Sequence, residues 1–289
     1  MYEKGIVIVM KKVIIYGNCQ IEYIENYLKA SLGFSKKYEI VLSKPIFAVS
    51  EKDVGIEKLA DCDVFIYQNI NGEFKHELKT ENIKKLLKKE CICINIPVAY
   101  FTGYFPQYAH NPVNKSSEKY VWGKYPYGDS NIIEFMESPL SNKKEEREQF
   151  LKKVESRDFY NEEFLKTNIK NSLEELRKRE CNCDFNISDL IEESYDKEYL
   201  FFTVNHPSFK IIRYMSVQIL KILGIDTYDI EDLVIEKLDH IMIPIYPSVA
   251  SGLELKFIDD GQLYNYIDGK ISFGHYMKDY IEFCYGLSE

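Results

Sequence analysis

The sequence predicts an α/β protein with an open, mostly parallel sheet flanked by helices. In the first half of the 289-residue chain, short apolar runs typical of buried strands alternate with amphipathic segments typical of helices. Such alternation indicates strand–helix–strand units with right-handed crossovers, which build parallel sheets. The length suits one large domain or a domain with an insertion. We therefore expect a single α/β domain over residues 1–289, with a helical insertion or lid at residues 141–199.

The elements of this sheet follow in order along the first hundred residues. Apolar runs predict four strands, at residues 13–16, 38–42, 63–67 and 91–96. Helical periodicity between them predicts three helices, at residues 21–32, 56–59 and 80–89. Gly33 follows the first helix, Thr80 is expected to cap the third, and Pro97 ends the fourth strand.

The second half of the chain is organised differently. Residues 99–129 are rich in aromatic residues, glycine and proline, and long loops of this kind commonly form the walls of a site. Residues 141–199 are highly charged and helical in pattern, which is also typical of a plain solvated helical face. The remaining elements are strands at 199–203 and 241–245, a helix after His206 that closes at Gly224, and a C-terminal helix at 275–285.

Composition excludes several classes of protein. Hydrophobic content of 45% and charged content of 29% are typical of a soluble globular protein. The net charge of −9 argues against general nucleic-acid binding, which needs a basic face. No segment approaches the roughly 18 apolar residues of a membrane-spanning helix, and the apolar run near the start is too short for one. We expect a cytoplasmic protein without membrane insertion.

The seven cysteines indicate reduced thiols, because their number is odd and several lie in or beside predicted strands. Cys91 and Cys93 alternate on one face of a strand, which favours core packing over a metal site. Cys181 and Cys183 lie in a polar linker, where a metal role has weak support from their spacing. We expect no metal.

Polar clusters follow three predicted strands: Gly17-Asn18-Cys19-Gln20, Gln68-Asn69 and Asn205-His206. The carboxyl ends of parallel strands meet at one edge of a sheet, where open α/β proteins bind their ligands, so we expect the three clusters to converge. Cys19 precedes a helix, whose N-terminus favours a thiolate. Each residue also has an ordinary structural explanation: a small residue at a helix start, a satisfied loop histidine, or asparagine in a turn.

Acyl transfer would use all three clusters. Cys19 is the candidate nucleophile, or it only shapes the oxyanion site, and the sequence leaves both roles open. His206 is the candidate general base, either for Cys19 or directly for the acceptor hydroxyl. Gly17, Asn18, Gln20, Gln68, Asn69 and Asn205 are candidates for the oxyanion or substrate site. His110, in the aromatic segment, is a further candidate for the substrate site.

Four stretches together resemble one known family: GNCQ after the first strand, DVFIYQN, the segment ELRKRE…DFNISDLI, and LFFTVNHPS before an amphipathic helix. From about Lys11 to Pro247 the chain is similar to the WcbI-type polysaccharide biosynthesis family. The resemblance implies an acetyltransferase of capsule assembly that binds coenzyme A and acylates a sugar hydroxyl. It also makes Arg179 a site candidate.

The arrangement is similar to SGNH-type hydrolases as well, and implies an SGNH- or flavodoxin-like core. Here Cys19 replaces the serine nucleophile, and no aspartate stands two or three residues before His206. The phosphates of coenzyme A require basic groups and free N–H groups. The candidates are Arg177, Arg179, Lys210 and Arg213, although a solvated helix end explains the first two equally well.

We therefore expect a cytoplasmic O-acetyltransferase that uses acetyl-coenzyme A as its acyl donor and a sugar or glycan precursor as its acceptor, in surface polysaccharide biosynthesis. One alternative is an SGNH-like esterase, which needs no coenzyme A. Another is a non-catalytic module that binds a nucleotide or a glycan. The sequence leaves the acceptor and the oligomeric state open.

Overall fold

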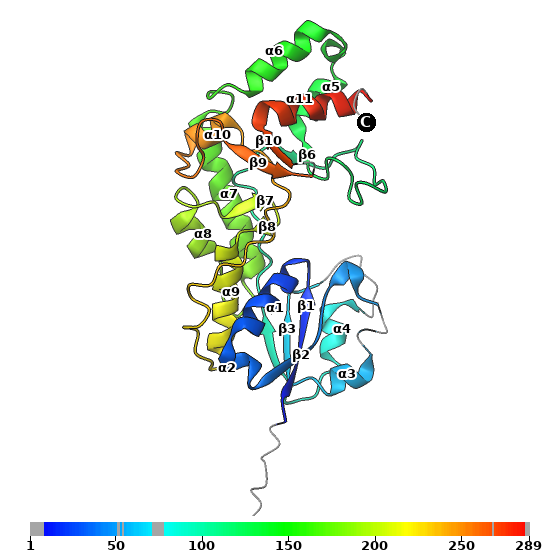
Figure 1. Cartoon of the computed structure of the whole chain (residues 1–289), viewed down its shortest axis with the longest axis vertical. Coiled ribbons are helices and arrows are strands. Elements are labelled where there is room, and N and C mark those ends of the chain that lie inside the picture. Colours follow the sequence, from blue (N-terminus) through cyan, green and yellow to red (C-terminus); the bar gives the residue numbers. More distant parts are fainter. Residues whose placement is uncertain (1–8, 51–52, 54, 71–77, 268, 287–289) are drawn as a thin grey trace, which may run out of the picture. The chain divides into compact units, whose positions relative to one another are not determined.

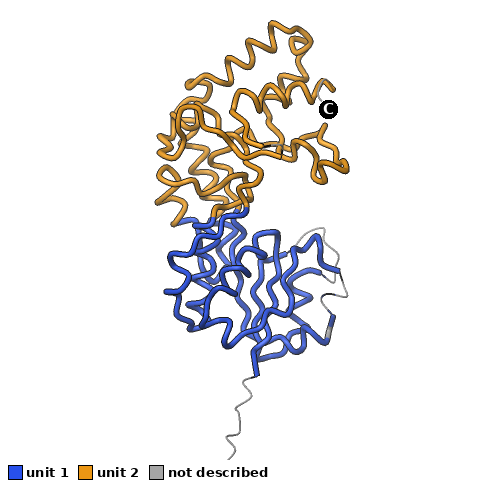
Figure 2. The backbone as a smooth tube through the Cα atoms, in the orientation of Figure 1, with its two compact units in different colours: residues 1–99, 177–189, 209–237 blue, residues 100–176, 190–208, 238–289 orange. Residues whose placement is uncertain are grey.

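A computed structural model describes residues 9–50, 53, 55–70, 78–267 and 269–286. The chain divides into two compact units, coloured separately in Figure 2. Unit 1 comprises residues 1–99, 177–189 and 209–237, and unit 2 comprises residues 100–176, 190–208 and 238–289. The expected single domain stays a prediction.

Unit 1 is built on a four-stranded parallel sheet, in the order β2-β1-β3-β4. The strands are β1 (Lys11–Gly17), β2 (Tyr38–Pro45), β3 (Val64–Tyr67) and β4 (Ile92–Asn95). β1 and β3 lie in the middle, and every residue of β3 is buried, as expected of a strand covered on both faces. The sheet confirms the predicted α/β class.

Helices cover both faces of this sheet (Figure 1). α1 (Gln20–Ala30) buries its apolar stripe against β1, β2 and α9 (Phe209–Ile222). The other face carries a core in which Ile14, Tyr16 and Phe65 pack with Leu59 and Ile83 of the helices α3 and α4. The remaining bounds are α2 (Leu32–Ser35), η1 (Ile46–Ala48), α3 (Ile56–Ala60) and α4 (Thr80–Lys84).

Tertiary contacts change the third predicted helix. Thr80 is not its N-cap, which is Lys79. The Thr80 hydroxyl instead accepts a hydrogen bond from the Ile70 N–H at 2.8 Å and donates to the Gln68 carbonyl at 3.4 Å. The helix also ends at Lys84, earlier than the predicted residue 89. Side-chain bonding to the end of β3 therefore overrides the local capping preference.

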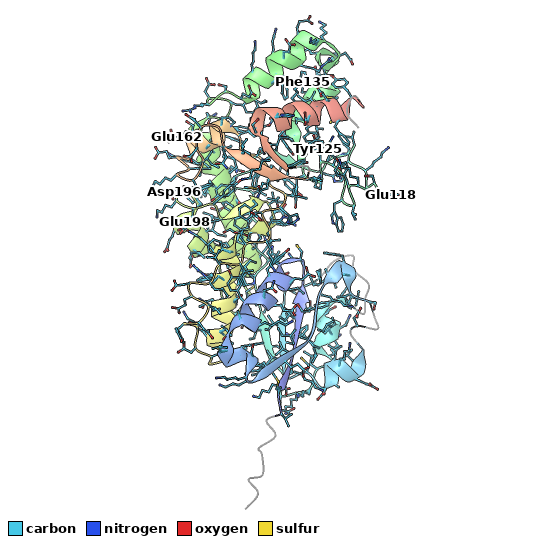
Figure 3. The ribbon with its side chains drawn as sticks, viewed as in Figure 1. Glu118, Tyr125, Phe135, Glu162, Asp196 and Glu198 are labelled. Carbon is cyan, nitrogen blue, oxygen red and sulfur yellow. The ribbon has the colours of Figure 1, made fainter. Side chains whose placement is uncertain are left out.

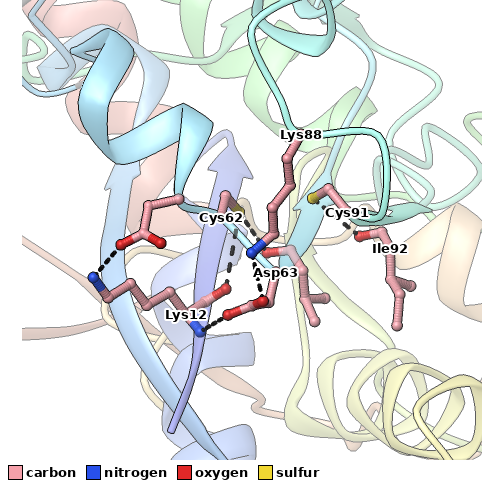
Figure 4. Close-up of polar contacts among 8 residues, drawn as sticks. Lys12, Cys62, Asp63, Lys88, Cys91 and Ile92 are labelled. Atoms are coloured by element: carbon pink, nitrogen blue, oxygen red, sulfur yellow. Dashed lines mark hydrogen bonds and ion pairs between the residues drawn. The ribbon is translucent and has the colours of Figure 1, made fainter. Parts of the chain in front are cut away.

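The amino edge of the sheet is held by Asp63 (Figure 4). Its carboxylate accepts from the Lys12 backbone N–H at 2.7 Å and from the Lys88 ammonium at 2.6 Å. Cys62 is fully buried there, but Cys93 is exposed and Cys91 is only half-buried. The predicted core packing is confirmed for Cys91, which packs against the core cluster around Cys62, but is wrong for Cys93, because the first half of edge strand β4 is exposed.

Unit 2 contains three two-stranded antiparallel sheets and an aromatic core. The strand pairs are β5 (Tyr108–Ala109) with β6 (Gly128–Asp129), β7 (Phe201–Thr203) with β8 (His206–Pro207), and β9 (Leu263–Tyr266) with β10 (Gly269–Ser272). The aromatic core centres on Tyr125, which stacks on Tyr280 with ring centroids 4.2 Å apart. The other rings around Tyr125 are Tyr266 of β9 and Tyr276 and Phe283 of the C-terminal helix α11 (Phe273–Cys284).

The region 141–199 is helical, as predicted. The helices of this part of the chain are α5 (Ser130–Glu137), η3 (Pro139–Asn142), α6 (Lys144–Val154), α7 (Glu162–Glu180), α8 (Ser188–Ser194) and, later, α10 (Pro247–Gly252). A role as a lid stays a prediction. In the described parts of the chain, no helix combines the length and the apolar character that a bilayer crossing requires.

Two predicted strands of the second half differ from expectation. β7 does not join the parallel sheet but forms a tight hairpin with β8. Residues 241–245 form no ladder, although the Met242 N–H donates to Asn265 and the Ile243 N–H to Phe202. Both segments have the apolar character of strands, but their pairing is decided by partners in unit 2. β7 pairs with the short strand β8, and residues 241–245 make isolated backbone hydrogen bonds.

Candidate functional site

The turn after β1 presents Cys19 at the carboxyl edge of the parallel sheet of unit 1. Cys19 takes the N-cap position of α1, but its side chain makes no capping bond. Asn18 does the capping, because its Oδ1 accepts from the Gln20 N–H at 2.9 Å and its carbonyl accepts from Ile21. The Cys19 thiol therefore does not cap the start of the helix, and Cys19 is partly exposed.

A pair of buried amides holds this turn. Gln68 and Gln20 are both 0% exposed. The Gln68 Oε1 accepts from the Asn18 N–H at 2.8 Å, and its Nε2 donates to Gln20 Oε1 at 3.1 Å and to the Pro97 carbonyl at 3.2 Å. Gln20 closes the network through Ala99, with Nε2 donating to its carbonyl at 2.7 Å. The amides thus join the ends of β1 and β3 to the segment after β4, and they position the turn without facing solvent.

Glycine is required at position 17 by this amide pair. A Cβ there would lie 2.5 Å from Gln68 Oε1 and 2.8 Å from Ile21 Cγ2. Real side chains do not come this close, so a larger residue would displace the Gln68 carboxamide. Gly17 therefore leaves the space that the Gln68 carboxamide occupies, and Gln68 in turn holds the Asn18 N–H.

The backbone N–H groups of the turn have different roles. The N–H of Asn18 donates to Gln68, and that of Gln20 donates to Asn18. The Cys19 N–H donates to no backbone carbonyl within the described ranges, and its contact is with its own thiol. Of the three, it is the group that could donate to an oxyanion.

Burial raises the pKa of the Cys19 thiol, and the nearby Glu22 adds to this. The contact with its own backbone N–H lowers the pKa but is outweighed. This direction is opposite to the low-pKa thiolate that the helix start predicts. Burial, and then the Cys19 thiolate one turn earlier on α1, raise the pKa of the Tyr23 phenol. The i, i+4 spacing of Cys19 and Tyr23 would have revealed this neighbour in the sequence.

The basic cluster at the end of α7 lies in unit 1. Asn95, the last residue of β4, pairs with Asp184: its N–H donates to Asp184 Oδ2 at 2.6 Å and its carbonyl accepts from the Asp184 N–H at 2.8 Å. This pairing holds the loop after α7 beside the carboxyl end of β4. Arg177 and Arg179 are exposed, and Arg177 pairs with Asp189 at 3.6 Å.

The other basic candidates and Asn69 are also in unit 1. Arg213 on α9 donates to the Leu233 carbonyl at 3.3 Å and lies 5.3 Å from the Phe209 ring centroid, so its guanidinium already supports the fold. Lys210 is half-buried on the same helix. Asn69 is exposed directly after Gln68.

His206 lies in unit 2, in the hairpin of β7 and β8. The Leu238 carbonyl accepts a hydrogen bond from its imidazole, and its Nδ1 is buried with no partner among the described residues. Burial, and then the neighbouring His240, lower the pKa of His206 to about 4. The ring of His240 is 5.7 Å away. His206 is therefore neutral near pH 7, with a lone pair on Nδ1.

A network of hydroxyls and an amide fixes the backbone before His206. Thr203 Oγ1 donates to Asn205 Oδ1 at 3.1 Å and accepts from the His206 N–H at 3.1 Å. The Tyr127 hydroxyl donates to Asn205 Oδ1 at 3.0 Å, and its ring meets His206 edge-on at 6.2 Å. Sequence analysis missed Tyr127 and Thr203. His110 is exposed after β5.

The predicted convergence of Cys19 and His206 rested on β7 belonging to the parallel sheet, which it does not. The two residues lie in different units, so a shared site stays a prediction. Among the described residues, no carboxylate takes the place of the SGNH aspartate, since a backbone carbonyl is the hydrogen-bond partner of the His206 imidazole. Within the residues that the structure describes, no three His, Cys, Asp or Glu side chains are arranged to hold a metal ion.

Comparison with known proteins identifies the family. A sequence profile described as polysaccharide biosynthesis enzyme WcbI matches residues 12–227. The chain belongs to the WcbI family. A solved WcbI structure, of native protein without a disulfide bond between coenzyme A and one of its cysteines, has a similar fold at a TM-score of 0.80. The two sequences are 19% identical, and the similarity covers 95% of this chain and 89% of that one. No curated protein sequence matches the chain.

The stability of this WcbI family protein should depend on the buried side chain of Gln68. We expect Gln68→Ala to lower the free energy of unfolding by about 3 kcal/mol, because it removes the acceptor of the Asn18 N–H and the donor to Gln20 Oε1. The exposed neighbour gives a matched control, and Asn69→Ala should change stability by less than about 0.5 kcal/mol. Urea denaturation measures both. Equal effects would show that the amide network does not hold the turn.

Two groups of unit 2 give opposite pH dependences. The pKa of His206 falls from 6.5 to about 4 on folding, so stability is lost as the pH falls below 6.5. Burial raises the pKa of Asp129 from 3.8 to about 6, so stability is gained as the pH falls below 6. When the pH is lowered from 7.5 to 5, the free energy of unfolding of His206→Gln should rise by about 2 kcal/mol relative to that of the wild type. That of Asp129→Asn should fall by about 1 kcal/mol relative to the wild type. Denaturation at both pH values tests the signs, and parallel curves for all three proteins would contradict them.

The raised pKa of Cys19 predicts a slow thiol. At pH 7 we expect iodoacetamide to modify Cys19 at least severalfold more slowly than the exposed Cys93 and Cys181, because the thiolate is the reactive form. The difference should shrink above pH 9 and vanish in denaturant. Peptide mass spectrometry gives the rate for each cysteine. Preferential labelling of Cys19 at pH 7 would restore the low-pKa expectation.

Proposed function

We propose that this WcbI family protein is a coenzyme A-dependent O-acyltransferase, and specifically an acetyltransferase. Its acceptor is a hydroxyl of a sugar or glycan precursor in surface polysaccharide biosynthesis. The observation that carries the proposal is the Cys19 turn: a partly exposed thiol and an N–H that, among the described residues, donates to no other residue's backbone, at the edge of a parallel sheet where ligands bind. The solved WcbI structure is of native protein without a disulfide bond between coenzyme A and one of its cysteines. We infer that Cys19 is the cysteine that lies beside bound coenzyme A in this chain.

The residues of unit 1 fit the donor. Arg177 and Arg179 stand exposed on the end of α7, and guanidinium groups bind phosphate through paired, charge-assisted hydrogen bonds. The loop that follows is fastened to the carboxyl end of β4 by Asn95, which gives the cluster a fixed base. Lys210 is a further candidate, whereas Arg213 is held by Leu233 and Phe209. When bound, acetyl-coenzyme A supplies the acyl group as a thioester.

The electrostatics of Cys19 favour direct transfer over an acyl-cysteine. A thiol whose pKa is raised by burial is protonated at pH 7 and is a poor nucleophile. The Cys19 N–H would instead donate to the carbonyl oxygen of the thioester as negative charge develops there. The Cys19 thiol then shapes the space beside the acyl group.

His206 takes the role of general base for the acceptor hydroxyl. Its Nδ1 carries a lone pair with no partner among the described residues, and Leu238 fixes the ring. The proton moves from the acceptor hydroxyl to Nδ1 as the hydroxyl oxygen bonds to the acyl carbon. Breaking the carbon–sulfur bond releases coenzyme A, and its thiolate recovers the proton. Because the pKa of His206 is about 4, the base stays deprotonated above pH 5. The transfer rate should therefore show no decrease due to protonation of His206 between pH 8 and pH 5.

Calorimetry and a transfer assay test the proposal together. Arg179→Ala should weaken coenzyme A binding about tenfold or more, while Lys170→Ala, an exposed charge elsewhere on α7, should leave it unchanged. His206→Ala should keep coenzyme A affinity and lose about a hundredfold to ten-thousandfold in transfer to a glycan acceptor.

Other outcomes would identify the alternatives. Hydrolysis of simple esters without coenzyme A binding would indicate an SGNH-like esterase. Binding of a nucleotide or glycan with no turnover in any assay would indicate a binding module. Accumulation of acetyl-Cys19 on the way to product would replace direct transfer by a covalent route.

A further inference from the structure

Residues 111–125 of unit 2, here called the lysine–tryptophan loop, hold large apolar side chains in water. Val121 is 68% exposed and Trp122 is 67% exposed, with Val113 at 43%. Trp122 is the only tryptophan in the chain. Single exposed apolar residues are ordinary, but adjacent ones of this size on one loop are typical of an interaction site.

The loop is built to hold this shape. Asn114 donates from Nδ2 to the Trp122 carbonyl at 2.7 Å and accepts at Oδ1 from the Tyr125 N–H at 3.0 Å. Asn111 donates to the Tyr125 carbonyl at 3.0 Å, which closes the base of the loop. Gly123 has φ +85°, and the close approach of Asn114 leaves no room for a side chain there. Side-chain bonds therefore specify the turn that presents Val121 and Trp122.

The charge of the loop is opposite to that of the whole chain. The loop contains three lysines, Lys115, Lys119 and Lys124, and one carboxylate, Glu118, within a protein of net charge −9. Figure 3 shows Tyr125 against the core of unit 2 and Glu118 in the outer part of the loop. At physiological ionic strength, charges more than about 8 Å away are screened. An approaching surface therefore meets a local charge of +2 beside the apolar tip.

We propose that the lysine–tryptophan loop binds the surface of an anionic lipid bilayer. Indole rings favour the headgroup layer, and lysines close to it are attracted by anionic lipids. Trp122 and Val121 would enter this layer while the lysines meet the lipid phosphates. This is attachment at the surface, with no spanning segment, and it is independent of the proposed acyl transfer.

The distribution of groups favours a bilayer over a soluble anionic saccharide. A pocket of about 530 Å³ beside the loop is lined by Val113, Lys115, Ser117, Tyr120 and Lys124, among others, but not by Val121 or Trp122. A saccharide in that pocket would use the lysines and leave the apolar tip in water. A bilayer surface offers both an anionic and an apolar layer, so it covers both groups at once.

The single tryptophan gives a direct test. Intrinsic fluorescence of the full-length protein is recorded while vesicles of phosphatidylcholine, with or without about 30% phosphatidylglycerol, are added. We expect a blue shift with the anionic vesicles only, reduced at high salt. No shift with anionic vesicles overturns the proposal. A shift that depends on protein concentration without vesicles indicates a second copy, and an equal shift with a soluble polyanion such as heparin indicates a saccharide; either also overturns it.

Variants separate the two layers of the contact, with vesicle co-sedimentation as the measurement. Val121→Asp should abolish binding, and Lys115→Ala or Lys119→Ala should each weaken the partition about fivefold. Tyr228→Asp, an equally radical change at an 80% exposed residue of unit 1, is the matched control and should bind like the wild type. All four positions face solvent, so circular dichroism should show unchanged folding. Equal binding by Val121→Asp and the wild type overturns the proposal, whatever the transfer assay shows.

Discussion

The buried carboxamide of Gln68 is the constraint on which the carboxyl edge of the sheet in unit 1 depends. A primary amide with no solvent access must place all its hydrogen bonds inside the protein, since each unpaired group costs about 1–3 kcal/mol. Gln68 does so by joining the turn after β1, Gln20 and the segment after β4. These partners come from two separate parts of the chain and Gln68 itself from a third, so one side chain fixes the mutual position of three segments. The glycine at position 17 follows from it, because no larger residue leaves room for the amide.

This constraint also determines the chemistry that Cys19 can perform. With Asn18 capping α1 and Gln68 holding Asn18, neither the Asn18 nor the Gln20 N–H remains to stabilise an anion at the turn. The helix N-terminus therefore has less to offer a thiolate than its position indicates, and desolvation decides the direction of the Cys19 pKa. A protonated thiol beside one available N–H suits the binding of a thioester better than attack on it.

Local patterns were sufficient to predict the parallel sheet and the Cys19 turn. Strands β1 to β4 and helix α1 are specified by apolar periodicity over a few residues, and the stripe of α9 is likewise readable from its own sequence. The errors arose where distant partners decide. Thr80 bonds to the end of β3, Cys93 lies on an edge strand, and β7 pairs with β8 in place of the sheet. The joining of Gln20 to Gln68 was equally invisible, because a buried amide and an exposed one look alike in sequence.

The overall charge of −9 is a poor guide to what this protein binds, because ionic screening limits each group to its neighbours. Two exposed basic clusters stand out locally: Arg177 to Arg179 in unit 1 and the lysine–tryptophan loop in unit 2. Their side chains differ in a way that matches different anions. Guanidinium groups, as in the first cluster, are suited to paired bonds with a discrete phosphate, whereas lysines, as in the second, are point charges suited to a diffuse anionic surface. Apolar groups accompany only the second cluster, since a soluble cofactor has no hydrocarbon layer for Trp122 to enter. The contrast between the two clusters is therefore the reason to assign a small phosphorylated ligand to one and a bilayer to the other.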